Sequence, residues 1–450
     1  MDHISRRNFL RRSGEAAVGL SAAALVGDGL VARAAGETEP TKKAMRVPMA
    51  VRLQPSWLSW VSSVAGCLNA LGAVCDNVDV AGHSGYAFLT NVADNVDVSG
   101  PTTVNFLLLA SGLLPLGRSI LVFTGATCMK GKSDDFRFAY DFVAGEIAAG
   151  RPCVIWGAHV PEFGIAVGVE DRKYIVESLT EKHDPIPFDK LSACVGAQVL
   201  AFPTAAGRMG VERDSSALHH ALACLSFQTG DPKYACGQAA YDRWIAAMES
   251  GKTDPFGNSY NTQCWTDAKR MAHAFVTRLA ERNAAVSKQL GAAAAAYAEV
   301  VAAMERVADL FPFPDSEKKV EDPKIRAQAI EPFRAAKAAE AKATNALAAA
   351  VAAWPKTPAT GKEVAMLAPC GIDCAKCDIL ARGECAGCRG DRSKQWSGDC
   401  KLRACCVDEK YLAFCNQCAQ FACQKLKDWA AAYPHHAAAL ARLKEMKAAG

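Results

Sequence analysis

The sequence has little net charge, no strongly apolar run and no internal repeat. Its 51 Lys and Arg residues are nearly balanced by 47 Asp and Glu residues, which leaves a formal net charge of +4. Because there is also no stripe of basic and aromatic residues, nucleic acid is not an expected partner. No repeat is long enough for a solenoid, and no segment after residue 34 has the roughly 20 apolar residues of a membrane-spanning helix. We therefore expect a globular chain of about two or three domains.

The N-terminus carries a short motif of the kind that directs export. Residues 5–11 read SRRNFLR and resemble the twin-arginine motif S-R-R-x-F-L-K. A weakly apolar stretch follows over 16–31, and Ala32-Arg33-Ala34 fits a small-x-small cleavage site. The stretch is too short and too rich in glycine to hold the chain in a bilayer. We predict a signal peptide over 1–34, a periplasmic or otherwise exported protein, and no transmembrane anchor after cleavage.

Composition divides the rest of the chain and predicts an α+β fold. Residues 35–50 are polar and predict a linker. Short apolar runs predict strands in an α/β domain over 51–205, namely 120–123, 153–156, 163–169, 174–176 and 199–202. Residues 206–354 predict a helical extension, with helices inside 214–312 and over 325–353. Residues 355–361 predict a second linker, and residues 362–450 a cysteine-rich metal-binding domain.

Five motifs between residues 66 and 244 belong together. They are GCLNALG (66–72), GHSGYAF (82–88), VPEFGI (160–165), PIPFDKL (185–191) and YDRW (241–244). With these motifs, residues of about 51–312 resemble the papain-like domain of butirosin-biosynthesis proteins of the BtrH type, which is distantly related to bacteriocin-processing cysteine peptidases. The resemblance implies a papain-like fold and an acyl-transfer or amide-cleaving ancestry. It implies that a protein, peptide or acyl substrate is the partner.

The same resemblance assigns roles to individual residues. Cys67 matches the nucleophile, but Glu162 occupies the strand position that should carry the catalytic histidine. A neighbouring carboxylate raises the pKa of a thiol and so activates it poorly. His159, three residues earlier, is then the candidate base, and Asp171 is the residue that could orient it. The alternative is a buried structural Cys67, because free cysteine is among the most buried residue types.

The C-terminal region is dense in cysteine. Eleven of the 19 cysteines lie between Cys370 and Cys423, and three pairs have the C-x-x-C spacing that lets two sulfurs share one tetrahedral ion. An exported protein normally favours disulfides, but a twin-arginine substrate can bind its metal in the cytoplasm before export. Zinc is therefore the expected cofactor, with an iron–sulfur cluster or a disulfide-linked knot as alternatives. A radical enzyme is not expected, because such an enzyme needs a large partial barrel after the motif and 73 residues follow Cys377.

Residues of about 362–450 resemble a small bacterial cysteine-rich domain of unknown function with the pattern CGxDCxxC, CxGC, a lone Cys and CxxC-x4-C. The resemblance implies zinc-ribbon-like binding and no established reaction. Two zinc ions need about eight ligands. The expected ligands are Cys370, Cys374, Cys377, Cys385, Cys388, Cys400, Cys415 and Cys418, followed by Cys423. The adjacent Cys405 and Cys406 stay outside this set. A single amphipathic helix is expected over 424–447.

Two functions follow from these observations. In the first, the chain is an exported binding or scaffold protein, with a degenerate papain-like domain and a structural zinc domain. In the second, Cys67 serves a cysteine-dependent acyltransferase, amidase or peptidase. The sequence favours the first because Glu162 stands where a histidine is expected. Electron transfer through an iron–sulfur tail is a third hypothesis.

Overall fold

The computed structural model describes residues 44–124, 133–180, 184–191, 198–205, 212–355, 367–385, 387–388, 395–410, 412 and 414–448. Over these residues the protein is mixed α and β, as the sequence predicts. It has two hydrophobic cores, a large one over residues 47–350 and a small one over residues 368–443. We call the part around the first core the body and the part around the second core the module. The predicted signal peptide 1–34, most of the linker 35–50 and nearly all of the linker 355–361 lie outside the described residues.

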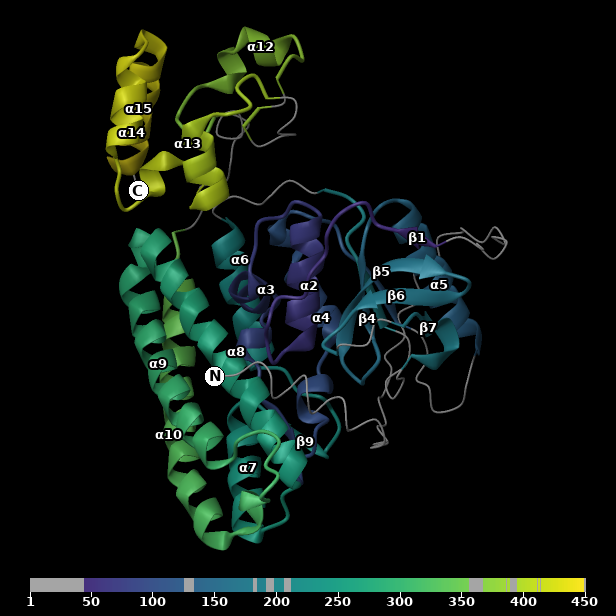
Figure 1. Ribbon diagram of the computed structural model, residues 1–450. Helices are drawn as coiled ribbons and strands as arrows, with labels where there is room; N and C mark the ends of the chain where they lie inside the picture. The colour runs from purple at the N-terminus through teal and green to yellow at the C-terminus, as the bar shows by residue number, and fades with distance from the viewer. Residues whose placement is uncertain are drawn as a thin grey trace.

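A seven-stranded antiparallel sheet forms one side of the body (Figure 1). Its path runs β3-β8-β4-β5-β6-β7, and β1 pairs with β5. The strands are β1 (Met45–Arg46), β3 (Leu121–Thr124), β4 (Cys153–Trp156), β5 (Phe163–Glu170), β6 (Lys173–Glu177), β7 (Ile186–Pro187) and β8 (Gln198–Ala201). The five strands expected from apolar runs are confirmed. A second sheet pairs β2 (Asn91–Ala93) with β9 (Tyr234–Cys236).

Strand β5 is buried along almost its whole length because helices contact it. The helices in contact are α2 (Ser59–Ala70) and α5 (Ser133–Ala148). Glycine at position 66 permits the close approach of α2, since a Cβ there would lie 2.5 Å from the carbonyl oxygen of Arg52 and 2.7 Å from the Ile165 side chain. Two shorter helices, α3 (Asn77–Ser84) and α4 (Phe106–Ser111), complete this part of the body.

Long helices form the other side of the body in Figure 1. They are α6 (Glu212–Leu225), α7 (Gln238–Ser250), α8 (Pro255–Arg282), α9 (Ser287–Leu310) and α10 (Pro323–Ala353). Both α8 and α10 begin with an aspartate N-cap followed by proline, which satisfies a free amide and presets the first helical φ angle. The expected helices over 214–312 and 325–353 are confirmed, with β9 interposed between α6 and α7.

The described part of the module consists of short helical turns followed by two longer helices, α14 and α15. Its elements are η8 (Cys374–Lys376), α12 (Asp378–Ala381), α13 (Lys401–Arg403), the π-helical η10 (Ala404–Glu409), η11 (Cys415–Gln417), α14 (Gln424–Ala431) and α15 (Pro434–Ala448). In its described residues the β structure is one isolated bridge, Leu367 to Asp373. The expectation of one helix over 424–447 is wrong. Proline begins a helix readily but cannot continue one, and Pro434 starts α15.

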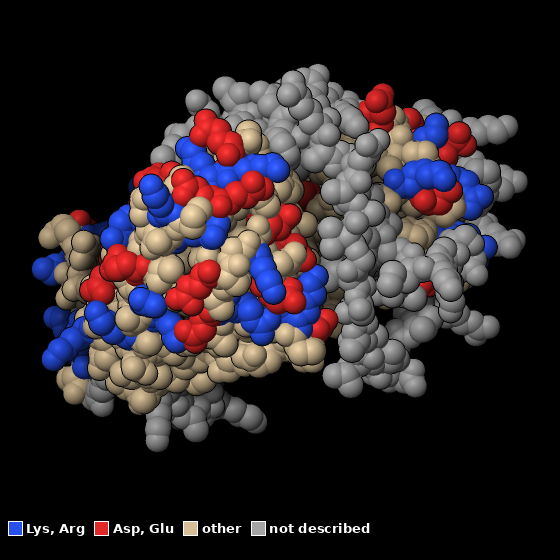
Figure 2. Space-filling model, turned by 90° about the horizontal axis from the view of Figure 1, so that it is seen from below, with Lys and Arg blue, Asp and Glu red and all other residues tan. Residues whose placement is uncertain are grey.

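Charge is distributed evenly over the surface that Figure 2 shows. Lys and Arg are interspersed there with Asp and Glu, in line with the small net charge. In the described part of the chain, no helix combines the length and the apolar character needed to span a bilayer.

Candidate functional site

Cys67 lies in the third turn of α2, inside the core of the body. Its side chain is fully buried, and burial raises the pKa of the thiol because the charged form loses its hydration. The thiol of Cys153 on β4 interacts with Cys67, and its own pKa is raised first by burial and then by Cys67. Cys67 therefore holds its proton and presents no reactive sulfur to solvent.

The structure does not bring the three candidate catalytic residues together. His159 follows β4, where its Nδ1 lies 3.2 Å from Ser178 Oγ and its Nε2 lies 2.9 Å from the carbonyl oxygen of Asp184. Asp171 is exposed in the turn after β5, at the opposite end of that strand. An eight-residue strand is about 25 Å long, so Asp171 cannot orient His159. Both residues have positive φ angles, 68° for His159 and 42° for Asp171.

Glu162 instead contacts a serine and a tyrosine that the sequence analysis did not single out. Its Oε2 accepts a hydrogen bond from Ser59 Oγ, and its Oε1 accepts one from Tyr260 Oη at 2.7 Å. The Phe163 amide donates to Ser59 Oγ at 3.1 Å. These bonds join α2, the start of β5 and α8. Ser59 and Glu162 are 103 positions apart in the chain, so no local sequence pattern predicts their contact.

The Glu162 carboxylate also offsets the partial positive charge at the N-terminus of α2. That helix has no acidic residue in its first turn, and its N-cap, Leu58, provides no side-chain hydrogen bond. A negative charge at a helix N-terminus is favourable because the backbone amides there carry partial positive charge. The cavity beside Ser59, Glu162 and Tyr260 measures about 10 Å³, which is room for about one water molecule. Glu162 thus has a structural role, and the cavity is too small for a substrate.

The cysteines of the module fall into two groups. The first thiol group consists of Cys370, Cys374, Cys377, Cys385, Cys388 and Cys400. The pKa of Cys388 is raised to about 11, first by burial and then by its neighbours Cys374, Cys400 and Cys385. The pKa of Cys370 is raised to about 12, again first by burial, with Cys388 and Cys400 among the lesser causes. Mutual electrostatic effects of this kind place the thiols close together.

Backbone amides point at sulfur in the first thiol group. Cys385 Sγ accepts hydrogen bonds from the amides of Gly387 at 3.3 Å and Trp396 at 3.4 Å. Cys370 has a backbone hydrogen bond with Ile372, also two residues later. Amide donors stabilise a thiolate, which is the form that binds a metal.

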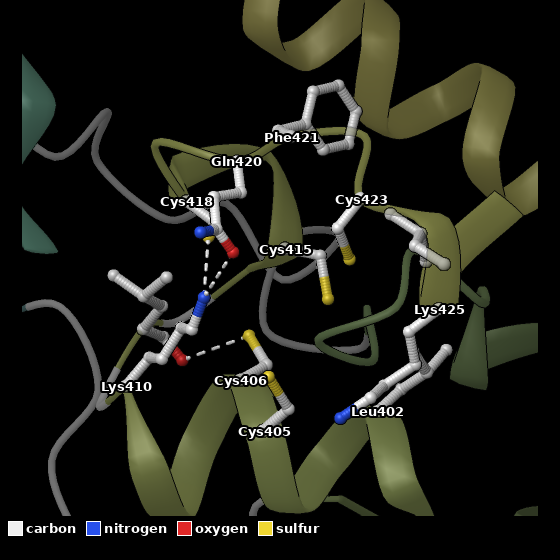
Figure 3. A pocket seen from close by; sticks show the side chains of 12 residues that line it. Leu402, Cys405, Cys406, Lys410, Cys415, Cys418, Gln420, Phe421, Cys423 and Lys425 are labelled. Atoms are coloured by element: carbon white, nitrogen blue, oxygen red, sulfur yellow. Dashed lines mark hydrogen bonds between the residues drawn. The ribbon is translucent and has the colours of Figure 1, made fainter.

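The second thiol group consists of Cys405, Cys406, Cys415, Cys418 and Cys423. All five line one cavity of about 30 Å³, which Figure 3 shows from close by. A hydrogen bond with Cys406 lowers the pKa of the Cys415 thiol, against the opposing effect of burial. Lys410 Nζ lies 3.3 Å from Cys418 Sγ. Cys370 and Cys415 also interact, so the two groups adjoin.

The nine expected metal ligands therefore all lie in the module, six in the first thiol group and three in the second. As the side chains stand, no set of three or more Cys, His, Asp or Glu residues in the described ranges is arranged to hold an ion. The donor set fits a soft ion nevertheless, because thiolates prefer zinc and related metals. Rotation about the Cα–Cβ bond of each cysteine moves its sulfur, so the thiols can turn toward a shared ion. Cys406, which is outside the set of expected ligands, belongs to the second group and lines its cavity.

One comparison matches part of the chain. The family described as "Protein of unknown function (DUF3795)" matches residues 366–428, which cover both thiol groups of the module. The body lies outside that match. No curated protein matches the chain.

Proposed function

We propose that the protein is an exported binding or scaffold protein whose papain-like body has lost thiol catalysis and whose module binds zinc. The twin-arginine motif at residues 5–11 supports export. The partner of the body is a protein or peptide. Zinc in the module is structural, as in zinc-ribbon-like domains, since a closed site of four thiolates leaves no open position for water.

The burial of Cys67 is the single observation that carries the loss of catalysis. A catalytic thiol needs solvent access, a lowered pKa and a base within hydrogen-bond reach. Cys67 is fully buried and its pKa is raised. His159 instead contacts Ser178 and the Asp184 carbonyl.

The position of Glu162 supports a papain-like ancestry. In papain-like enzymes the nucleophile stands at the N-terminus of a helix and faces a strand-borne histidine. Here the residue at the N-terminus of α2 is Ser59, and it faces Glu162 just before β5. Cys67 lies eight residues further along, about 12 Å up the helix axis. Under this proposal Ser59, and not Cys67, occupies the position of the nucleophile, and its hydrogen bond to Glu162 is a structural link.

The module's chemistry supports zinc. The candidate ligands are Cys370, Cys374, Cys377, Cys385, Cys388, Cys400, Cys415, Cys418 and Cys423. When bound, zinc would crosslink the turns that carry these thiols. The amides that donate to Cys385 Sγ would stabilise it as a thiolate ligand.

Cysteine labelling tests both halves of the proposal. The mature folded protein is pulsed with an alkylating agent at several pH values, with and without chelator, and each cysteine is mapped by peptide mass. Cys67 should label no faster than Cys153, its equally buried neighbour and matched control. The cysteines of the module should label only after chelation. Rapid labelling of Cys67 below pH 7 would support a cysteine enzyme instead. Module cysteines that require reduction and ignore the chelator would establish disulfides, and a brown protein would indicate an iron–sulfur cluster.

A further inference from the structure

We propose that Cys406, Cys415, Cys418 and Cys423 form a metal site of their own, which takes a zinc-like ion independently of the first thiol group. This inference rests on the proposed metal binding of the module and adds to it. It assigns Cys406 as a ligand, and it divides the module into two sites.

The four sulfurs belong to three separate segments that meet at one cavity. Cys406 lies on η10, Cys415 begins η11, Cys418 is the C-cap residue of η11, and Cys423 is the N-cap residue of α14. In Figure 3 the sulfurs of Cys406, Cys415 and Cys423 face the same space. The cavity of about 30 Å³ has room for one ion. Four thiolates around one ion is the usual arrangement of a structural zinc site.

Cys406 is the better ligand of the adjacent pair. Its side chain is only 3% exposed and lies within hydrogen-bond reach of Cys415. Cys405 is more exposed and interacts with Lys425 and Lys410. Adjacent residues of the π-helical η10 point in different directions, so one ion cannot easily take both thiols.

Positive groups surround this site. Lys410 Nζ lies 3.3 Å from Cys418 Sγ and 3.3 Å from Gln420 Oε1, and Lys425 also lines the cavity (Figure 3). A divalent ion with four thiolates has a net charge of −2, which the two lysines would offset. Cys423 stands at the N-terminus of α14, where the helix dipole favours a negative sulfur.

The first thiol group is sufficient for another ion without these residues. It contains three cysteines from C-x3-C-x2-C spacing, a further C-x-x-C pair and Cys400. Its members interact mainly with one another, through Cys374 and Cys388 for example. Separate loss of the two ions is the property that distinguishes two sites from one shared cluster.

Cobalt substitution tests the inference. The reduced, full-length mature chain is loaded with Co²⁺, and bound metal and the sulfur-to-cobalt charge-transfer absorption are measured per chain. We expect about two ions in the wild-type chain and half that uptake in Cys406→Ser and Cys418→Ser. Cys405→Ser, the matched control beside Cys406, should keep the wild-type uptake. Far-UV circular dichroism checks that each variant is folded.

Lys410→Met provides a second measurement that leaves every ligand in place. Loss of an outer partner should speed release of half of the bound metal to a chelator by roughly tenfold. Lys427→Met, an exposed lysine on α14, should release metal at the wild-type rate. If Cys406→Ser binds as much metal as the wild type, or Cys405→Ser loses as much as Cys406→Ser, the inference is wrong while the metal proposal stands. A wild-type chain that binds no metal overturns the metal proposal itself.

Discussion

The body and the module use cysteine in opposite ways. In the body, Cys67, Cys153, Cys224 and Cys264 are each buried among apolar side chains, and burial raises the pKa of Cys67 and Cys224. In the module, most thiols are half-buried and lie beside other thiols. In the body each thiol packs as a small apolar group. In the module the thiols lie beside one another.

The difference follows from the size of the two cores. The body contains one extensive core that joins its sheet and its long helices. Among the described residues, the core of the module has six buried members, one of which is Cys370. Small domains bury too little apolar surface to offset the conformational entropy of folding and often need metals or disulfides. We infer that the module requires its cysteines for folding and that the body does not.

Metal removal should give the largest effect and tests that contrast directly. Chelation should remove hydrogen-exchange protection from residues 367–448, because structural zinc supplies about 10–16 kcal/mol of apparent binding free energy to small domains. Residues 255–310, in α8 and α9, should keep their protection and serve as the internal control. Segment-resolved hydrogen exchange measures both. Retained protection throughout the module would show that it folds without metal.

A buried ion pair tests what the body depends on instead. Lys269 on α8 and Glu340 on α10 are both buried, and Lys269 Nζ also donates to the Leu89 carbonyl at 3.0 Å. Glu340→Ala should lower the free energy of unfolding by about 3–5 kcal/mol, because it leaves a buried ammonium without its counter-ion. Urea unfolding followed by tryptophan fluorescence measures the change. Chelation should not alter it.

The matched control for this pair lies on the surface. Glu299 and Lys342 join α9 to α10 at 3.0 Å, but both are exposed. Glu299→Ala should have little effect, since exposed pairs are screened by water. The double variant Lys269→Met, Glu340→Leu should recover most of the lost stability. Equal losses in Glu340→Ala and Glu299→Ala would contradict the assigned role of the buried pair.

Short-range sequence patterns predicted the strands and helices that depend on neighbouring residues. Apolar runs identified β4 to within its bounds, and helical periodicity identified α9 and α10. The three-residue strands β2 and β9 were missed because their pairing depends on residues some 145 positions apart. Pro434 was a local signal for a second helix that the periodicity concealed.

The candidate sites depend on contacts between distant residues. C-x-x-C spacing identifies pairs of thiols but cannot say which pairs share a cavity, so the role of Cys406 needed the structure. The sequence also predicts that Glu162 occupies the position where a thiol enzyme would carry its histidine. The contacts of Glu162 with Ser59 and Tyr260 arise from tertiary packing, which no local pattern predicts.

A buried histidine should produce the smallest effect, a pH dependence that belongs to the body alone. His83 on α3 is fully buried, and its Nε2 accepts a hydrogen bond from Arg213 Nε at 2.7 Å, so the ring is neutral. Burial, Arg213, Arg282 and His220 lower its pKa well below 6.5. The unfolded chain then binds a proton that the folded chain does not. The contribution of His83 to the free energy of unfolding is complete above about pH 6.5. It decreases below that pH by at most about 1.4 kcal/mol per pH unit.

His83→Gln should flatten this slope, because glutamine can accept the bond from Arg213 without titrating. His219→Gln, at an exposed position on α6, is the control and should leave the slope unchanged. Acid also protonates the thiolates of a metal-loaded module, so bulk unfolding would mix the two processes. Hydrogen exchange of α3 and α8 between about pH 5 and 7 isolates the body. An unchanged slope in His83→Gln would assign the acid sensitivity of the body to other groups, and the contrast with the module would then rest on metal alone.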